Sequence, residues 1–470
     1  MADDATVAGS HDVRRSWGSV ALYVSAIGSA LFMVRLLGAS WNTHFPATWP
    51  DAVYPKQGYL AVAGKSPLRP SFYFAFRPIG YPFLLWVLRR RSLATVVVQT
   101  ALYCAVVIAL GAAAFRVLHS RVVATVTTLA FVGIAIQAKY ALWNTQILSE
   151  SLAISLGFAA IAAWWRFAAA PTRARARWGW GFVITWLLVR DAHVLPATVV
   201  IVPVALAVAA LGRALDPGVR RTLAVGAVAV MVAAGYSYFS AGASHRAELS
   251  FHDVVGIRVL PDKQLTKWFA ARGMPLNDAL RTRTGKGGLV DDFYLSKDPA
   301  FANYRHWARG AGPRDLVLSL AVLAPHYADL MSNDLPAILR ADVKQYDTYG
   351  VYDRLPRQMP LQLGGPTTRT GLAIWLFLAT AGVATSLVLA LRRKRGIGMV
   401  IFGATALTLT FLEGYLTWGG DPVELERHMI GALSRLSVLL VIVIASSVDA
   451  VIYALRSHPA DEPAEAEAGV

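Results

Sequence analysis

The sequence predicts an all-α integral membrane protein with several transmembrane helices, on three observations. Hydrophobic residues make up 56% of the 470 positions. The mean hydropathy is +0.46. Several uninterrupted apolar runs approach the ~20 residues that a helix needs to cross a bilayer, and the alternating pattern of an outer-membrane barrel is absent.

The apolar runs predict about ten transmembrane helices. The first run follows Arg14 and Arg15 and is too long for the apolar core of a signal peptide, so we expect a retained span with a cytoplasmic N-terminus. The expected spans lie near residues 18–38, 92–115, 122–138, 147–166, 178–190, 194–211, 222–241, 371–391, 396–416 and 429–455.

The basic clusters predict the orientation of these spans. Four connections expected inside are rich in arginine, whereas the short outer connections carry one positive charge each. This places both termini in the cytoplasm of a bacterial inner (plasma) membrane. The net charge of +16 is then explained by topology and lipid headgroups rather than by nucleic-acid binding. The inner connections are 116–121, 172–177, 213–221 and 392–395.

The segment 71–91 does not fit a regular span. Residues 71–88 are apolar and contain Pro78 and Pro82, and three arginines follow. If this segment crossed the membrane, four later basic clusters would face the wrong side. We therefore expect a juxtamembrane helix that lies along the outer face, with Arg89–Arg91 at the headgroups.

The expected organisation has two large external parts. Residues 1–17 form a cytoplasmic N-terminus, and residues 18–241 form a transmembrane core whose first outer loop is 39–91. Residues 242–370 form a large extracytoplasmic loop with amphipathic helices. Residues 371–455 hold the last transmembrane helices, and 456–470 form an acidic, disordered tail.

Ionisable residues near these spans gather on the expected outer side. Ionisable side chains cost free energy in a membrane, so their presence indicates a function. They come from distant parts of the sequence, which favours chemistry at the outer leaflet. They are Asp51 in the first outer loop, Arg77, Glu150 at the start of a span, Arg190, Asp191 and His193 in an outer turn, and Asp421, Glu424, Glu426, Arg427, His428 and Arg435 at the start of the last span.

Each of these residues also has a structural interpretation. Asp51 is of a type common in turns, and Glu150 suits the first turn of a helix. Arg77 can extend to lipid headgroups, and Arg190 can pair with Asp191. In 420–428, Asp421 suits an N-cap with Pro422 and Glu424 following at helix-start positions.

The basic residues of the last span are not explained in that way. His428 and Arg435 are seven residues apart and share one helix face. We expect Arg77, Arg190, Arg427, His428 and Arg435 to bind a phosphate.

With these residues in place, the chain resembles the GT-C superfamily of integral-membrane glycosyltransferases. That group includes protein O-mannosyltransferases, lipid A aminoarabinose transferases and bacterial arabinosyl- and mannosyltransferases of the cell envelope. The likeness lies in "PDAVYPKQGYLAVA" (50–63), "RPIGYPFLL" (77–85) and "NTQILSESLAISL" (144–156), and more loosely in "LLVRDAHVLPA" (187–197) and "ERHMIGALSRL" (426–436). The resemblance implies a GT-C-like helical bundle with juxtamembrane helices.

The resemblance also implies a reaction. Asp51 would be the catalytic acid/base, and the donor sugar would be carried on a polyprenyl phosphate. The first outer loop has one carboxylate where the family's metal-dependent branches have a pair. Asp51 would take the proton from an acceptor hydroxyl that attacks the anomeric carbon, with inversion at the sugar. Glu150 is the alternative catalytic carboxylate.

The arginines would stabilise the monophosphate leaving group without a metal. We expect Tyr54, Tyr59, Tyr81 and Asp191 to contact the sugar or acceptor, which is a cell-envelope glycan, lipid or protein. No cofactor and no protein-bound metal are expected. A divalent metal stays open, because Asp291 and Asp292 or the carboxylates of 421–426 could bind a cation, although a solvated loop explains Asp291 and Asp292 as well.

Three other functions compete with a transferase. A flippase for lipid-linked oligosaccharides would place charges along a path across the membrane, often with repeated halves. An O-antigen-type ligase or polymerase would also use lipid-linked sugars outside, with a large late loop. A non-catalytic assembly protein could share the same scaffold. Phosphate-loop, zinc-protease and nucleophile-elbow motifs are absent from the sequence.

Overall fold

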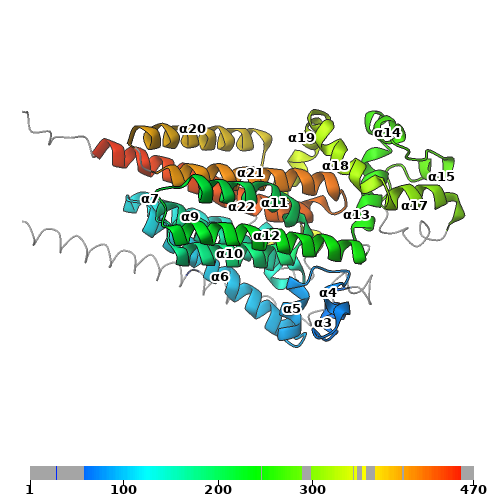
Figure 1. The fold of residues 1–470 in the computed structure, drawn as a ribbon, viewed down its shortest axis with the longest axis horizontal. Helices are drawn as coiled ribbons and strands as arrows, with labels where there is room; N and C mark the ends of the chain where they lie inside the picture. The colour runs from blue at the N-terminus through cyan, green and yellow to red at the C-terminus, as the bar shows by residue number, and fades with distance from the viewer. Residues whose placement is uncertain are drawn as a thin grey trace, which may run out of the picture.

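Long parallel and antiparallel helices form a bundle, and short helices collect at one end of it (Figure 1). This is a computed structural model. It describes residue 28 and residues 58–244, 246–287, 298–341, 343–346, 352–355, 366–393 and 396–456. No β-strand occurs within these residues. The expected first span, 18–38, lies outside the described residues apart from Gly28.

Seven of the described helices are long and apolar enough to cross a membrane. The chain is therefore a multi-pass membrane protein. These candidate spans are α6 (Ser92–Val117), α9 (Ser149–Ala169), η2 with α11 (Asp191–Leu211), α12 (Pro217–Ala243), α20 (Arg369–Arg393), α21 (Ile397–Gly420) and α22 (Leu425–Arg456).

Two further expected spans have a different form. Helix α10 (Arg173–Val189) has 17 residues, one fewer than the 18 residues taken as the minimum for a span. Helix α7 (Arg121–Ala135) ends at an extended residue, Gln137, and the chain continues at an angle of 65° through α8 (Ala138–Ala141) and η1 (Leu142–Thr145). Residues 139–146, expected as a short outer connection, form most of α8 and all of η1 and are buried. The described residues do not confirm the count of ten.

Side-chain caps explain where several long helices begin. The hydroxyl of Thr172 accepts a hydrogen bond from the N–H of Arg175 at the start of α10. Asp216 accepts hydrogen bonds from Gly218 and Val219, and Pro217 occupies the first position of α12. At the same end of the bundle, the buried carboxylate of Asp449 on α22 accepts hydrogen bonds from the N–H groups of His119 and Ser120, at 2.9 and 2.6 Å. It thereby holds the start of α7 against the last helix.

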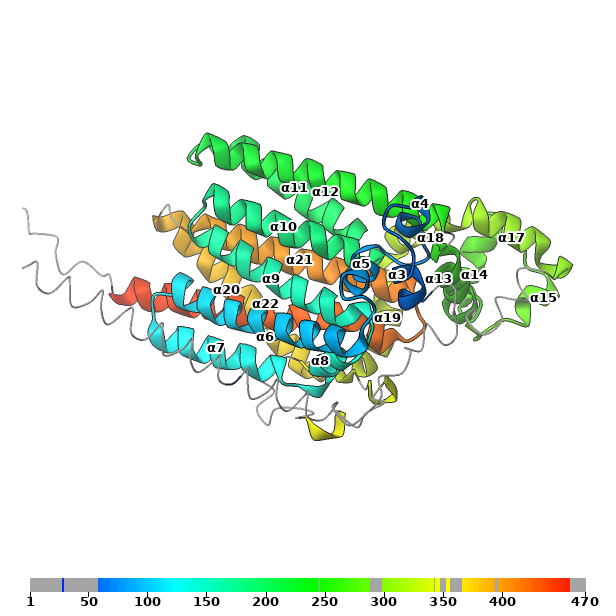
Figure 2. The same ribbon diagram turned by 90° about the horizontal axis from the view of Figure 1, so that it is seen from below.

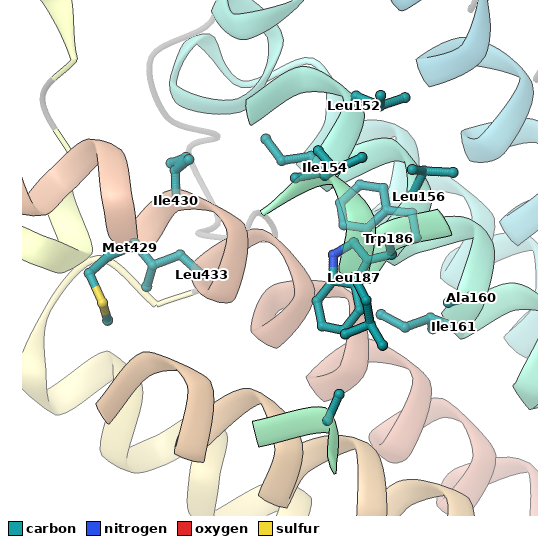
Figure 3. Close-up of a cluster of buried hydrophobic side chains, with 14 of the residues drawn as sticks. Leu152, Ile154, Leu156, Ala160, Ile161, Trp186, Leu187, Met429, Ile430 and Leu433 are labelled. Atoms are coloured by element: carbon teal, nitrogen blue, oxygen red, sulfur yellow. The ribbon is translucent and has the colours of Figure 1, made fainter. Parts of the chain in front are cut away.

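Helix α9 is the centre of the bundle. Every residue from Ser149 to Ala162 is buried, and α9 contacts α6, α10, α21 and α22. Its many alanines and serines allow close helix packing, as is usual in membranes. Figure 3 shows part of the resulting core, in which side chains of α9, α10 and α22 meet; they include Leu156, Trp186 and Leu433. By contrast, α20 lies at the upper edge of the bundle in Figure 1 and behind α22 in Figure 2.

The segment 71–91 forms two short helices, α4 (Pro70–Tyr73) and α5 (Gly80–Val87), and neither is long enough to cross a bilayer. Together with α3 (Tyr59–Ala63), they lie at the same end of the bundle as the helices after α12 (Figure 1). Those helices are α13 (Arg246–Val254), the π-helix η3 (Val255–Val259), α14 (Lys263–Ala270), α15 (Asp278–Arg281), η4 (Pro299–Phe301), α17 (Ala302–Arg309), α18 (Gly312–Val322), α19 (Ala324–Arg340), η5 (Lys344–Tyr346) and η6 (Tyr352–Arg354).

Candidate functional site

A cluster of charged side chains lies at the bundle end where the short helices collect. We call it the end cluster; its members are Glu150, Arg190, Asp421, Glu424, Arg427 and His428. Glu150 is in the first turn of α9 and its side chain is 1% exposed. The Nε of Arg427 donates to Glu150 Oε1 at 2.8 Å, and Nη1 of Arg190 lies 3.8 Å from the same oxygen. One buried carboxylate thus joins α9, α10 and α22.

The start of α22 differs from the expected helix start. The helix begins at Leu425, and Glu424 has a left-handed backbone with φ of 52°. The carbonyl of Glu424 accepts the N–H groups of Arg427 and His428, at 2.9 and 3.1 Å. Asp421 is therefore not the N-cap; its carboxylate instead binds Nδ1 of His428 at 2.8 Å. The expected capping pattern is wrong: α22 begins only at Leu425, and both carboxylates pair with basic side chains of its first turn.

These ion pairs are reflected in the titration of Asp421. Burial by itself would raise the pKa of Asp421, but the neighbouring His428, Arg427 and Arg190 lower the pKa below the usual range. Glu424 pairs with Nη1 of Arg427. Asp421 and Glu424 therefore both act as anionic partners within the end cluster.

Tyr346, from the large loop after α12, also reaches the end cluster. Its ring centroid lies 5.8 Å from the guanidinium carbon of Arg427 and 5.3 Å from the ring centroid of Trp143. Burial and a hydrogen bond to Glu424 raise the pKa of the Tyr346 hydroxyl well above its usual value. The loop thus closes over Arg427 and Glu424.

Aromatic side chains of α3 and α5 adjoin Glu150. The hydroxyl of Tyr59 is 2.9 Å from the Oγ of Ser149, the residue before Glu150. The Tyr59 ring packs edge-on against Tyr81 at 5.0 Å, and Arg77 lies over the same ring at 4.9 Å. The structure therefore brings Tyr59, Tyr81, Arg77 and Glu150 together, although they are distant in the sequence.

A glycine accounts for the close approach of α5 to α10. A Cβ at Gly80 would lie 2.9 Å from the carbonyl oxygen of Leu188 and 2.9 Å from a methyl group of Val189. Only glycine permits this contact without a backbone shift. Gly80 follows Arg77 by three residues, and Val189 precedes Arg190. The contact therefore fixes the two segments that carry these arginines against each other.

Two buried side chains, Glu150 and Arg77, keep unused hydrogen-bonding capacity among the described residues. Oε2 of Glu150 is buried without a hydrogen-bond partner there, and so is Nε of Arg77. Arg190 lies 3.8 Å from Glu150, beyond hydrogen-bond distance. A free acceptor and two incompletely used guanidiniums are the groups that a phosphate ester and an attacking hydroxyl require.

A second group of polar side chains lies deeper between the same helices. We call it the inner network; its members are Trp186, His193, Glu413 and Arg435. Glu413 pairs with Arg435, and Nδ1 of His193 is 3.1 Å from Glu413 Oε1. His193 stacks on Trp186 at 4.0 Å, and Arg435 lies 4.7 Å from the Trp186 ring. All four residues are buried.

One expected phosphate ligand, Arg435, lies in the inner network rather than in the end cluster. Arg435 is 3% exposed and is engaged by Glu413, about two helical turns below His428. Sequence reasoning missed Glu413, although a lone carboxylate inside an apolar span was a usable signal. It also missed Tyr346 and Ser149, for which the sequence gives no comparable signal.

The other predicted site residues are distributed as follows. Asp51, Tyr54, Asp291 and Asp292 lie outside the described residues. Tyr81 is fully buried, and its hydroxyl donates to Gln99 at 2.6 Å. Asp191 is half-buried at the start of η2 (Asp191–His193). In the part of the chain that the structure describes, no three histidine, cysteine or carboxylate side chains are grouped as a metal site would require.

The comparisons with known proteins give one distant likeness. No protein-family model matches the chain, and no curated protein matches it. The archaeal oligosaccharyltransferase AglB from Archaeoglobus fulgidus, solved in complex with an inhibitory peptide and a dolichol-phosphate, is similar with a TM-score of 0.40 and 12% identity. The alignment covers 91% of this chain and 50% of that one, so the chain spans about half the length of AglB. A likeness of this size assigns no activity.

Proposed function

We propose that this chain is a membrane glycosyltransferase. It transfers a sugar from a polyprenyl-phosphate donor to a cell-envelope acceptor on the extracytoplasmic face. One observation carries the proposal: the buried carboxylate of Glu150 shares one oxygen with two arginines at one end of an apolar bundle, and its other oxygen has no hydrogen-bond partner among the described residues. Charged groups at such a position are costly, and their usual reason is function.

The position of the charges favours a lipid-linked donor. A polyprenyl phosphate carries its phosphate at headgroup height, beside the end of a membrane bundle. Arg77 and Arg190 have guanidinium groups that internal partners use incompletely. Guanidinium forks bind phosphate oxygens in pairs and stabilise the negative charge that develops on a leaving phosphate.

The proposed reaction uses two carboxylates in different roles. The acceptor hydroxyl attacks the anomeric carbon as its proton passes to Asp51. The bond between the anomeric carbon and the phosphate oxygen breaks, and its electron pair stays on the phosphate. Glu150 positions Arg190 and Arg427 around that phosphate. Attack opposite to the leaving group inverts the configuration of the sugar.

The surrounding aromatic groups support a sugar site at the same place. Tyr59 and Tyr81 pack against each other beside Ser149, and Tyr346 covers Arg427 from the other side. Aromatic faces next to a few polar groups are typical of small-molecule sites. The loop that carries Tyr346 is the proposed cover of the acceptor site.

The test compares sugar transfer by four proteins in lipid nanodiscs: wild type, Asp51→Asn, Glu150→Gln and Arg173→Gln. Each is incubated with radiolabelled polyprenyl-monophosphate sugars and an extract of envelope acceptors. Arg173 is the control, because it forms a half-exposed ion pair with Asp216 at the other end of the bundle. We expect wild type and the control to transfer sugar, and Asp51→Asn to lose about 10²–10⁴-fold in rate because it lacks the general base. Glu150→Gln should also lose rate, because Arg190 and Arg427 lose their shared carboxylate.

Two outcomes would change the proposal. Full transfer by Asp51→Asn would move the base to another residue and leave the enzyme class intact. If wild type binds the donors but transfers none of their sugars to any acceptor, glycosyl transfer is the wrong function.

A further inference from the structure

The guanidinium of Arg427 is occupied on two sides by carboxylates of the chain itself. Its Nε donates to Glu150 at 2.8 Å, and its Nη1 pairs with Glu424. The side chain of Glu150 is 1% exposed, whereas that of Glu424 is 22% exposed. Glu424 is therefore the partner that an entering anion can reach and replace.

The backbone of Glu424 supports this interpretation. A φ of 52° is uncommon for residues other than glycine, asparagine and aspartate. Such conformations cost free energy, persist only where the surroundings enforce them, and concentrate at functional sites. Here the ion pair with Arg427 and the two N–H groups that the Glu424 carbonyl accepts hold the residue in place.

We propose that the Glu424 carboxylate occupies the position on Arg427 that the phosphate of a polyprenyl-phosphate ester takes when it binds. The inference rests on the proposed function, of which it names the donor-phosphate position. A carboxylate and a phosphate offer a guanidinium the same pair of oxygen atoms. Glu424 therefore competes with the ligand and sets its affinity.

The balance of charge in the end cluster also supports competition between Glu424 and the phosphate. Three carboxylates face two guanidiniums and the imidazole of His428, so an entering phosphate meets no excess of positive charge. Displacement of Glu424 frees Nη1 of Arg427. The displaced carboxylate keeps a neighbour, because Nε2 of His428 is 4.0 Å from its Oε2.

The same exchange involves the large loop. The hydroxyl of Tyr346 is hydrogen-bonded to Glu424, and its ring adjoins Arg427. When Glu424 leaves Arg427, this hydrogen bond is broken or moves with it. Binding of a phosphate at Arg427 thus changes the contact between Tyr346 and the end cluster.

The experiment measures binding by the full-length protein in nanodiscs. Wild type, Glu424→Gln and Glu426→Gln are titrated with polyprenyl monophosphate and, separately, with inorganic phosphate. Glu426 is the matched control, because it carries the same charge two residues further along and is no member of the end cluster. We expect Glu424→Gln to bind about tenfold more tightly than wild type and Glu426→Gln to bind as wild type does. In the double variant Glu424→Gln/Arg427→Gln the gain should disappear.

The two phosphates separate the possible sources of the ligand. A gain with both supports a site for the phosphate group alone, and a gain with polyprenyl monophosphate only supports a site for the lipid headgroup. Unchanged or weaker binding by Glu424→Gln, with an unchanged melting temperature, overturns the inference. If wild type transfers sugar in that case, the proposed function stands while this inference fails. If Glu424→Gln binds more tightly but no protein transfers sugar, this inference stands while the proposed function fails.

Discussion

The end cluster and the inner network both pair a glutamate with an arginine of α22, but they differ in access. In the end cluster, Glu424 is 22% and His428 is 17% exposed, and the arginines share carboxylates at uneven distances. In the inner network, Glu413 and Arg435 are each 3% exposed and Trp186 packs against both His193 and Arg435. An ion pair that solvent or ligand can reach is suited to exchange partners, whereas one sealed by an indole ring is suited to hold helices together.

The largest expected effect is on stability and separates the two ion pairs. Glu413→Ala leaves Arg435 as an uncompensated buried charge and should lower the free energy of unfolding by about 3–5 kcal/mol. Glu424→Ala removes a partly exposed partner of Arg427, which keeps Glu150, and should cost less than about 1 kcal/mol. Thermal unfolding in nanodiscs measures both. Equal losses would erase the distinction between the two regions.

A lower pH should destabilise one region more than another, because α13, which adjoins the end cluster, carries the histidine His252. Burial lowers the pKa of His252 on α13 to about 4, against a raising influence of Glu248 and a lowering one of Arg309. The unfolded chain binds this proton below about pH 6.5, whereas the folded chain resists it. The resulting stability is complete above pH 6.5 and is lost as the pH falls toward 4, by about 2 kcal/mol at pH 5.

Hydrogen exchange at pH 7 and pH 5 measures this loss by region. We expect α13 and α17, which His252 joins through its 2.9 Å hydrogen bond with Tyr304, to exchange faster at pH 5. Helix α20, which carries no histidine, should change less. A His252→Gln protein serves as the control and should show a smaller difference between the two pH values. Uniform acceleration in every helix would contradict the regional effect.

A smaller effect is expected for donor affinity. Arg190→Lys keeps the charge but loses the planar fork that holds two phosphate oxygens. We expect the KM for a polyprenyl-phosphate sugar to rise about tenfold, with no change in melting temperature, because Arg190 contacts Glu150 only at 3.8 Å. Arg173→Lys, at the other end of the bundle, is the control. A loss of stability equal to that of Glu413→Ala would assign Arg190 a structural role.

The smallest expected effect concerns Tyr59. Tyr59→Phe removes the 2.9 Å hydrogen bond to Ser149 and keeps the ring contacts with Tyr81 and Arg77. The loss of one such bond is worth about 0.5–1.5 kcal/mol, so kcat/KM should fall about two- to tenfold. Transfer assays at limiting donor measure it. A loss above a hundredfold would make the hydroxyl itself part of the chemistry.

Much of the helical architecture was predictable from the sequence, because hydropathy is a local property. The expected spans at 92–115 and 147–166 match α6 and α9 to within a few residues. The break in the span expected at 122–138 was not predictable. It depends on Gln137 adopting an extended backbone, which lets residues 138–145 pack into the core.

The gathering of site residues was predictable only in part. The sequence predicted that Glu150, Arg190 and Arg427 lie on the same side of the membrane. In the structure, Glu150 contacts both arginines. The sequence could not give their partners. Glu150 and Arg427 are 277 positions apart, and only the packing of α9 against α22 brings them together.

By itself, the sequence determined the apolar lengths of the helices, the caps that begin α10 and α12, and the concentration of charge near particular helix ends. These features depend on neighbouring residues, so no knowledge of the fold is needed. The tertiary structure alone decided which arginine is sealed against Trp186 and which remains within reach. It also decided that Glu150 meets Arg427, since this pairing of charges depends on distances across the bundle.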